Sequence, residues 1–185
     1  MGSKRSCEFR CCNNDQVSVP FYKSMKLDCN MMANLYIDMA IPAQEPLIRA
    51  LLAQHQLPND DIAHHLRHFH VANLDGRVIG AMGLEIYRPF ALARSLVVSQ
   101  DLWGQGVARQ LYKRSESYAR QQGVASLYLL TLTAPRFFGK RGFVEIDRSS
   151  VPGKIQKTRE FAEICPASAT CMVKHLNDPT HDPTQ

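Results

Sequence analysis

The sequence predicts a single α/β domain in which helices flank one mixed β-sheet. A chain of 185 residues corresponds to one domain on the usual length prior. Its composition, 45% hydrophobic and 21% charged, is that of an ordinary globular protein. Strand-like and helix-like hydrophobic periods also follow one another along the chain, in the order strand, two helices, three strands, helix, strand, helix and two strands.

The first half of the domain combines a short strand, two helices and a β-hairpin. Leucine and isoleucine at helical spacing predict a helix that Pro58 ends, and Asn59 or Asp60 can cap the next one. An Asp75-Gly76 turn between two apolar segments indicates the hairpin. The predicted elements are a strand at 35–40, helices at 43–54 and up to Leu66, and strands at 69–74, 78–87 and 92–98.

The second half contains a long amphipathic helix and a strand that is apolar on both faces. The helix, 106–121, places Val107, Leu111, Ser115 and Tyr118 on one face. Apolarity on both faces is typical of a central buried strand. The predicted elements after the helix are a strand at 127–132, a short helix at 135–141, a strand after Gly142-Phe143, a helical or turn segment at 151–164 and a final strand at 169–176.

The two ends of the chain lack a clear period. We expect residues 1–32 to be a disordered leader, residues 33–176 to form the domain, and residues 177–185 to be a flexible tail. The start, Met1 to Ser6, also fits the N-myristoylation pattern, which is an alternative role for the leader. No apolar run approaches the roughly 18–20 residues that a membrane-spanning helix needs.

Charge and cysteine placement narrow the function classes. A net charge of +5 suits an anionic small ligand as well as a nucleic acid, but there is no dense basic stripe or RNA-binding signature. Four of the six cysteines lie in the first thirty residues, and Cys165 and Cys171 lie near the end. In a disulfide-linked domain the cysteines would be spread through the fold, so we expect the protein to lie in the reducing cytoplasm.

The loop before the long helix has the features of a phosphate site. The strand at 92–98 ends, Gly104 and Gly106 follow, and a helix begins. The first N–H groups of a helix have no internal partners, and the helix dipole favours an anion there. The glycines could instead serve only steric needs of the turn. The loop does not match a P-loop, because no Gly-Lys-Ser/Thr follows, and it does not match a dinucleotide-binding fingerprint, because the third glycine is missing.

Two segments resemble the GNAT acetyltransferases. Trp103 to Ala108 is similar to the signature Arg/Gln-x-x-Gly-x-Gly/Ala, with Trp103 in the Arg/Gln place. Ala134 to Phe143 is similar to Ala-x-x-Phe-Tyr-x-x-x-Gly-Phe. The resemblance implies the GNAT fold and acetyl-CoA as cosubstrate. A homodimer is one possible assembly, because dimers are common in the superfamily. The cofactor contacts that it implies are Leu96, Val97, Val98, Gly104, Gln105, Gly106, Val107, Ala108, Arg109 and Phe138.

A finer resemblance concerns the acceptor. Gly83 to Glu85, Arg94 to Val98, Tyr128 to Thr131 and Cys165 to Ala169 are together similar to the arsenic-resistance N-acetyltransferases, which resemble amino-acid N-acetyltransferases. This resemblance implies acetylation of the amino group of a small anionic, amino-acid-like molecule. Acetylation of a protein, or a non-catalytic module that binds acyl-CoA or a partner, are the alternatives.

The candidate catalytic base is Glu85, near the end of its strand. An acceptor ammonium must lose a proton before it attacks the thioester, and a partly buried carboxylate there could take it, often through water. A solvated residue at a strand end is the alternative, and Glu45, Asp147 and Glu160 are lesser candidates. Family members often use a tyrosine to protonate the departing thiolate. Phe138 occupies that place here, so water, another group or unassisted departure must serve.

Arginines are the candidate anchors for an anionic acceptor. Arg94 lies in an otherwise apolar strand, where it either grips the substrate or forms an internal salt bridge to Glu85 or Asp147. Arg148 and Arg159 are further anchors unless they are solvated. A metal site is suggested by the run His64-His65-x-x-His68-x-His70. The predicted helix ends within this run, so its histidines are not expected to converge on one ion, and we expect no metal. Cys165 and Cys171 are expected to be structural thiols rather than a metalloid site.

Overall fold

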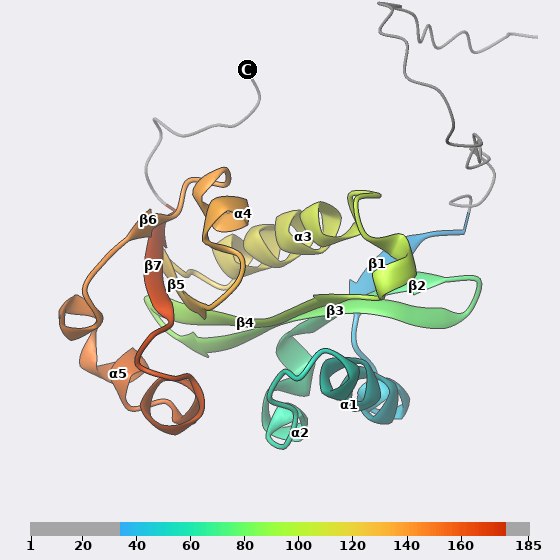
Figure 1. Cartoon of the computed structure of the whole chain (residues 1–185), viewed down its shortest axis with the longest axis horizontal. Helices are drawn as coiled ribbons and strands as arrows, with labels where there is room; N and C mark the ends of the chain where they lie inside the picture. Colours follow the sequence, from blue (N-terminus) through green and yellow to red (C-terminus); the bar gives the residue numbers. More distant parts are fainter. Residues whose placement is uncertain (1–33, 177–185) are drawn as a thin grey trace, which may run out of the picture. The chain divides into compact units, whose positions relative to one another are not determined.

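The computed structural model of the chain describes residues 34–176, and these form the domain shown in Figure 1. The expected leader with its N-myristoylation pattern and the expected tail lie outside the described residues. Within the described part of the chain, no helix is both long and apolar enough to cross a membrane.

All seven strands belong to one sheet, in the order β1-β2-β3-β4-β5-β7-β6. β4 and β5 run parallel, and every other neighbouring pair is antiparallel. This arrangement confirms the predicted mixed sheet and the predicted order of elements. The strands are β1 (Tyr36–Met39), β2 (Phe69–Leu74), β3 (Arg77–Tyr87), β4 (Phe90–Val98), β5 (Ser126–Thr131), β6 (Val144–Glu145) and β7 (Thr170–His175).

Helices cover both faces of the sheet. The α-helices are α1 (Glu45–Gln54), α2 (Ile62–His65), α3 (Val107–Gln121), α4 (Pro135–Gly139) and α5 (Gly153–Gln156). Figure 1 shows α3 and α4 on one face, and α1 and α2 on the other. A short π-helical turn, Glu160–Ile164, follows α5. Tyr118 was predicted on the buried face of α3, but it is only half-buried, and Tyr112 and Ala119 are buried with Val107, Leu111 and Ser115 instead.

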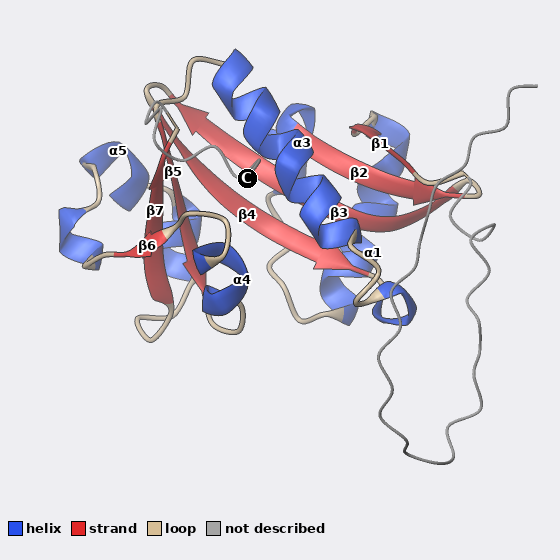
Figure 2. Ribbon diagram, turned by 90° about the horizontal axis from the view of Figure 1, so that it is seen from above, coloured by secondary structure: helices blue, strands red, loops and turns tan. Residues whose placement is uncertain are grey.

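The strands β4 and β5 separate part of the way along their length. Their pairing runs from Phe90 opposite Ser126 to Ala93 opposite Leu129 and then ends. On the other side of β4, Ala81 pairs with Val97 and Gly83 with Arg94, so Met82 faces two residues and β4 carries a bulge. Ser95 in this bulge has a φ of 57°. Figure 2 shows β4 and β5 diverging, with α4 near the opening between them. The end of β4 therefore has a free edge.

Gly83 places β2 and β3 in close contact two residues before Glu85. A Cβ added at Gly83 would lie 2.3 Å from the ring of Phe69, which is fully buried. We predict that Gly83→Ala lowers the free energy of unfolding by about 1–3 kcal/mol, because the overpacked ring has to move. Urea denaturation measures this change. Gly139→Ala is the matched control, since its Cβ would meet nothing within 4 Å. Equal stability of the two variants would contradict the close packing.

Candidate active site

A cleft of about 790 Å³ lies beside the end of β4, the following loop and the start of α3. Eight of the ten predicted cofactor contacts line it, namely Leu96, Val97, Val98, Gly104, Gly106, Val107, Ala108 and Arg109. Gln105 and Phe138 are not part of its wall. The sequence analysis did not name the other lining residues as cofactor contacts, among them His55, Trp103, Phe137 and Arg141. The cleft is therefore built largely from the segment that was predicted to bind phosphate.

The glycine loop opens toward free space. Gly104 and Gly106 have φ values of 79° and 82°, in the left-handed region that favours glycine. No atom lies within 4 Å of a Cβ built at either position. Gly106 is the N-cap of α3, and the first turn of that helix contains no acidic residue. The positive end of the helix is thus not neutralised from within, which suits a phosphate.

The free edge of β4 also faces the cleft. Ser99 donates its N–H to the Ile79 carbonyl on the β3 side, at 2.8 Å. Because successive residues of a strand point their backbone groups to opposite sides, the N–H and C=O of Val98 point away from β3. The Val98 carbonyl accepts a hydrogen bond from Trp103 Nε1 at 2.8 Å. The indole is thereby held in place, although 60% of Trp103 is exposed.

Phe138 belongs to the core rather than to the cleft wall. It is 7% exposed and packs edge-on against Tyr112 and Phe143. Phe137, one residue earlier, lines the cleft instead. Neighbouring residues of a helix point about 100° apart, so the rotation of α4 decides which ring faces the ligand. A hydroxyl at position 138 would consequently point into the core.

On the opposite face of the sheet, Arg94 contacts three carboxylates. Its Nη1 lies 2.7 Å from both Glu85 Oε1 and Asp61 Oδ2, and its Nη2 lies 2.9 Å from Asp61 Oδ1. Glu160 Oε2 is 3.0 Å from Nη2, without hydrogen-bond geometry. The Arg94 side chain is only 1% exposed. Burial raises the pKa of Glu160, and the negative charges of Glu85 and Asp61 raise it further. For Asp61, burial also acts to raise the pKa, but the interaction with Arg94 outweighs it and the pKa is lowered.

These contacts correspond to the internal salt bridge that was considered for Arg94. The N–H groups of its guanidinium donate to carboxylates of the chain itself, including that of Glu85. Arg148, the second predicted anchor, donates to the carbonyls of Pro166 and Phe161 at 2.9 and 2.8 Å. Both arginines therefore hold the chain together in this structure. Arg159 remains 52% exposed, with contacts of 3.4 and 3.5 Å to Asp60 and Glu163.

Glu85 is buried, at 2% exposure, so it is not the solvated strand-end residue of the alternative interpretation. Its Oε2 accepts a hydrogen bond from the Tyr87 hydroxyl at 2.9 Å and lies 3.8 Å from His65 Nε2. Burial lowers the pKa of His65, and the charge of Glu85 opposes this only in part. His65 is therefore a neutral imidazole at neutral pH, facing a carboxylate and 24% exposed through its side chain. The sequence analysis did not identify it as catalytic.

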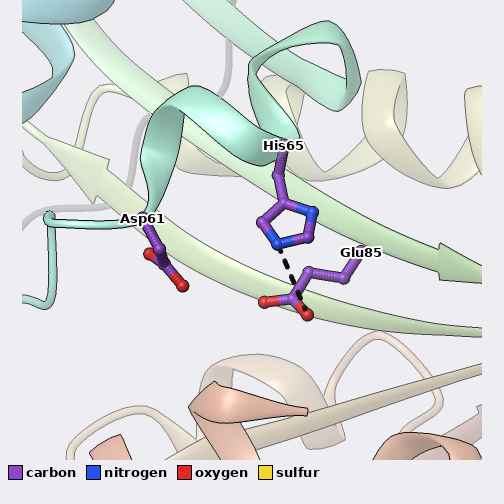
Figure 3. Close-up of side chains that lie close together, drawn as sticks. All are labelled: Asp61, His65 and Glu85. Atoms are coloured by element: carbon purple, nitrogen blue, oxygen red, sulfur yellow. Dashed lines mark ion pairs between the residues drawn. The ribbon is translucent and has the colours of Figure 1, made fainter.

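The four histidines of the sequence run do not converge. His68 Nδ1 is 2.8 Å from the Tyr118 hydroxyl, and His70 Nδ1 is 3.1 Å from Ser115 Oγ. His65 instead lies with Asp61 and Glu85, where one ligand atom from each falls within 4.8 Å of the others (Figure 3). The positive guanidinium of Arg94 already contacts both of these carboxylates, so a second cation would be repelled. The group fits proton transfer better than metal binding.

The two cysteines of the domain are free thiols. Cys171 is 3% exposed and Cys165 is half-buried. Burial raises the pKa of both, which disfavours the thiolate that a soft metalloid would need. Their environment fits structural thiols.

A mixed sheet that opens between two parallel strands, beside a glycine-capped helix, is the architecture of an acyl-CoA-dependent N-acyltransferase. Residues 31–143 match the profile of the Acetyltransferase (GNAT) family, and the chain belongs to that family. An uncharacterized N-acetyltransferase from Chlorobaculum tepidum is 33% identical over 122 residues, covering 63% of this chain and 76% of that protein. The chain is an N-acetyltransferase, and acetyl-CoA is its cosubstrate.

Solved structures with the same fold include two that hold CoA. N-acetylglutamate synthase from Neisseria gonorrhoeae, complexed with coenzyme A and N-acetyl-glutamate, has a TM-score of 0.68 at 20% identity over 78% of this chain. The chain spans only 35% of that protein's length. Rv2747 from Mycobacterium tuberculosis, in complex with CoA and NLQ, has a TM-score of 0.66 at 20% identity, covering 76% of this chain and 98% of the other. At these identities the likeness concerns the fold.

Trp103 is the only tryptophan of the chain, so its fluorescence reports directly on the cleft. We predict that CoA changes the emission of Trp103 saturably, because the ligand covers a ring that is now 60% exposed. A fluorescence titration, compared with calorimetry on the same protein, measures this effect. Trp103→Phe should lose the signal and keep binding CoA. Calorimetric binding with unchanged tryptophan emission would show that CoA binds away from Trp103.

Proposed function

We propose that the protein transfers the acetyl group of acetyl-CoA to the amino group of a small, anionic, amino-acid-like molecule in the cytoplasm. The observation that carries the proposal is the buried cluster around Glu85. It brings a carboxylate and a neutral imidazole to the sheet face where β4 leaves β5. A neutral imidazole beside a carboxylate can accept the proton that an acceptor ammonium group must lose.

The closure of the acceptor side supports a small acceptor. Asp61 precedes α2 and Glu160 begins the π-helical turn, and both contact Arg94. Both segments therefore lie close to Arg94, the partner of Glu85, whereas a polypeptide acceptor would need an open groove there. The fold likeness to N-acetylglutamate synthase and the four segments similar to arsenic-resistance enzymes favour an amino acid or a toxic analogue of one. Arg159 and the net charge of +5 support an anionic group.

The proposed base is the pair His65 and Glu85. The acceptor ammonium gives its proton to the His65 imidazole, directly or through water, and Glu85 and Asp61 stabilise the resulting imidazolium. Arg94 is a positioning residue that holds both carboxylates. The amine then attacks the thioester carbonyl, and free N–H groups of the β4 edge stabilise the oxyanion. The C–S bond then breaks and the nitrogen gives up its second proton to water. The CoA thiolate leaves unassisted or takes a proton from water, since Phe138 has none to give.

Two alternatives make different demands on the cleft. A protein N-acetyltransferase would act on peptides in preference to free amino acids. A binding module without turnover would bind CoA and release no thiol with any acceptor.

A panel of acceptors tests the proposed function. We expect acetyl-CoA-dependent release of free thiol with one or more acidic amino acids, or with phosphinothricin-like or arsenic-bearing analogues. N-terminal peptides are the comparison, and release with peptides alone would replace the proposal with protein acetylation. CoA binding without release above the acceptor-free background across the panel would favour the binding module.

The base is tested by Glu85→Gln and His65→Gln. Each should lower kcat by about 100-fold, the scale of general base catalysis, and leave the affinity for CoA unchanged. His64→Gln is the matched control, because His64 is exposed and lies next to His65. Full activity of both variants would remove the pair from the mechanism.

The pH dependence gives a second test of the same pair. His65 must be neutral to accept a proton, so kcat should fall on acidification through its lowered pKa, below the ordinary value of 6.5. The Glu85 charge raises this pKa, so Glu85→Gln should move the acid limb of the kcat profile to lower pH. His65→Gln should remove that limb. An identical acid limb in all three proteins would contradict the assignment.

A further inference from the structure

Two arginines on the wall of the cleft have no acidic partner. Arg109 lies in the first turn of α3, and Arg141 follows α4. Neither forms an ion pair within residues 34–176, whereas Arg94, Arg120 and Arg159 all contact carboxylates. Two like charges on one wall repel each other, and an anion placed between them would relieve that repulsion.

The guanidinium of Arg141 is held rigidly with one edge unused. Its Cζ atom lies 3.3 Å from the ring centroid of Phe137, and its Nη1 donates to the Phe137 carbonyl. Arg141 Nε is buried without an acceptor in the described part of the chain, and no bond from Nη2 is found there either. Burial lowers the pKa of Arg141, and the charge of Arg109 lowers it further. Nη2 therefore has no acceptor among residues 34–176 and is the group left to form a charge-assisted hydrogen bond to a phosphate.

Trp103 offers no cation to a phosphate at the place where the family signature has arginine or glutamine. In the family signature that place carries a polar or charged side chain, but the Trp103 indole donates to the Val98 carbonyl instead. We propose that Arg141, together with Arg109, binds a phosphate group of acetyl-CoA. The inference rests on the proposed placement of acetyl-CoA in this cleft, and Phe137 is the platform that orients Arg141.

The experiment compares ligands that differ only in their phosphates. Affinities of CoA, 3′-dephospho-CoA and pantetheine are measured by calorimetry for the full chain and for Arg141→Ala, Arg141→Lys and Arg136→Ala. Arg136 is the matched control, since it is an exposed arginine of α4 outside the cleft wall. Thermal melting of each variant identifies any loss of the folded state.

Loss of the charge-assisted bonds should weaken CoA binding to Arg141→Ala by about 10- to 100-fold. Arg141→Lys should fall between this variant and the wild type, because lysine keeps the charge but not the planar fork. Arg136→Ala should stay within about two-fold, and pantetheine should bind all variants alike. If dephospho-CoA loses affinity as CoA does, the pyrophosphate is bound. If dephospho-CoA binds wild type and Arg141→Ala equally, the 3′-phosphate is bound.

Two results would overturn the proposal. One is unchanged CoA affinity in folded Arg141→Ala, and the other is an equal loss for pantetheine, which would mean that only the shape of the wall had changed. These measurements need no acceptor. A failure to find the acetylated substrate therefore leaves their outcome intact and separates the two proposals.

Discussion

The separation of β4 from β5 after Ala93 is the constraint on which the active site depends. Up to that residue the two parallel strands satisfy each other's backbone groups, and beyond it β4 is bonded only toward β3. The unpaired edge is costly unless something else bonds to it. Trp103 takes one of its carbonyls, and the rest of the edge faces the cleft. The bulge at Ser95 lies two residues after Ala93, where the pairing with β5 ends. The free edge of β4, proposed to bind the cofactor, therefore begins next to Arg94 and its carboxylates.

A second constraint is the charge balance around Arg94. One buried guanidinium lies against three carboxylates, two of which come from segments distant in sequence. Buried charges of this kind rarely add much net stability, because their desolvation offsets their attraction. They do fix geometry, since removal of Arg94 would leave its carboxylates buried without a counter-charge. The cluster therefore holds α2, β3, β4 and the π-helical turn in one arrangement over the acceptor side.

The sequence predicted the parts of this molecule that depend on local patterns. The hairpin turn, the amphipathic α3, the doubly apolar β5 and the glycine loop all have short-range signals, and all lie where they were expected. Glu85 was identified from its strand position alone. The partners of Arg94 could not be predicted in the same way, because Asp61 and Glu160 lie 33 and 66 residues away and meet only in the folded sheet.

His65 and Phe137 show the same limit at shorter range. His65 was named only as part of the histidine run, and Phe137 only as part of the segment in which Phe138 was the predicted cofactor contact. Which of two neighbours faces the site depends on the rotation of a helix of four or five residues. So short a helix has too few turns for its buried face to be deduced from periodicity. The alignment with a family motif identifies the segment, and packing selects the side chain.

Arg94, directly before the bulge, contacts residues on both sides of the proposed active site. The residue bonds to Ser95 Oγ at 3.3 Å on the strand that borders the cofactor cleft, and to Asp61 on the acceptor side. A molecule that displaced Asp61 would leave Arg94, on the strand that borders the cleft, without one of its carboxylate partners. Any effect of this loss on cofactor binding would be reciprocal, because thermodynamic linkage makes each substrate alter the binding of the other by the same factor.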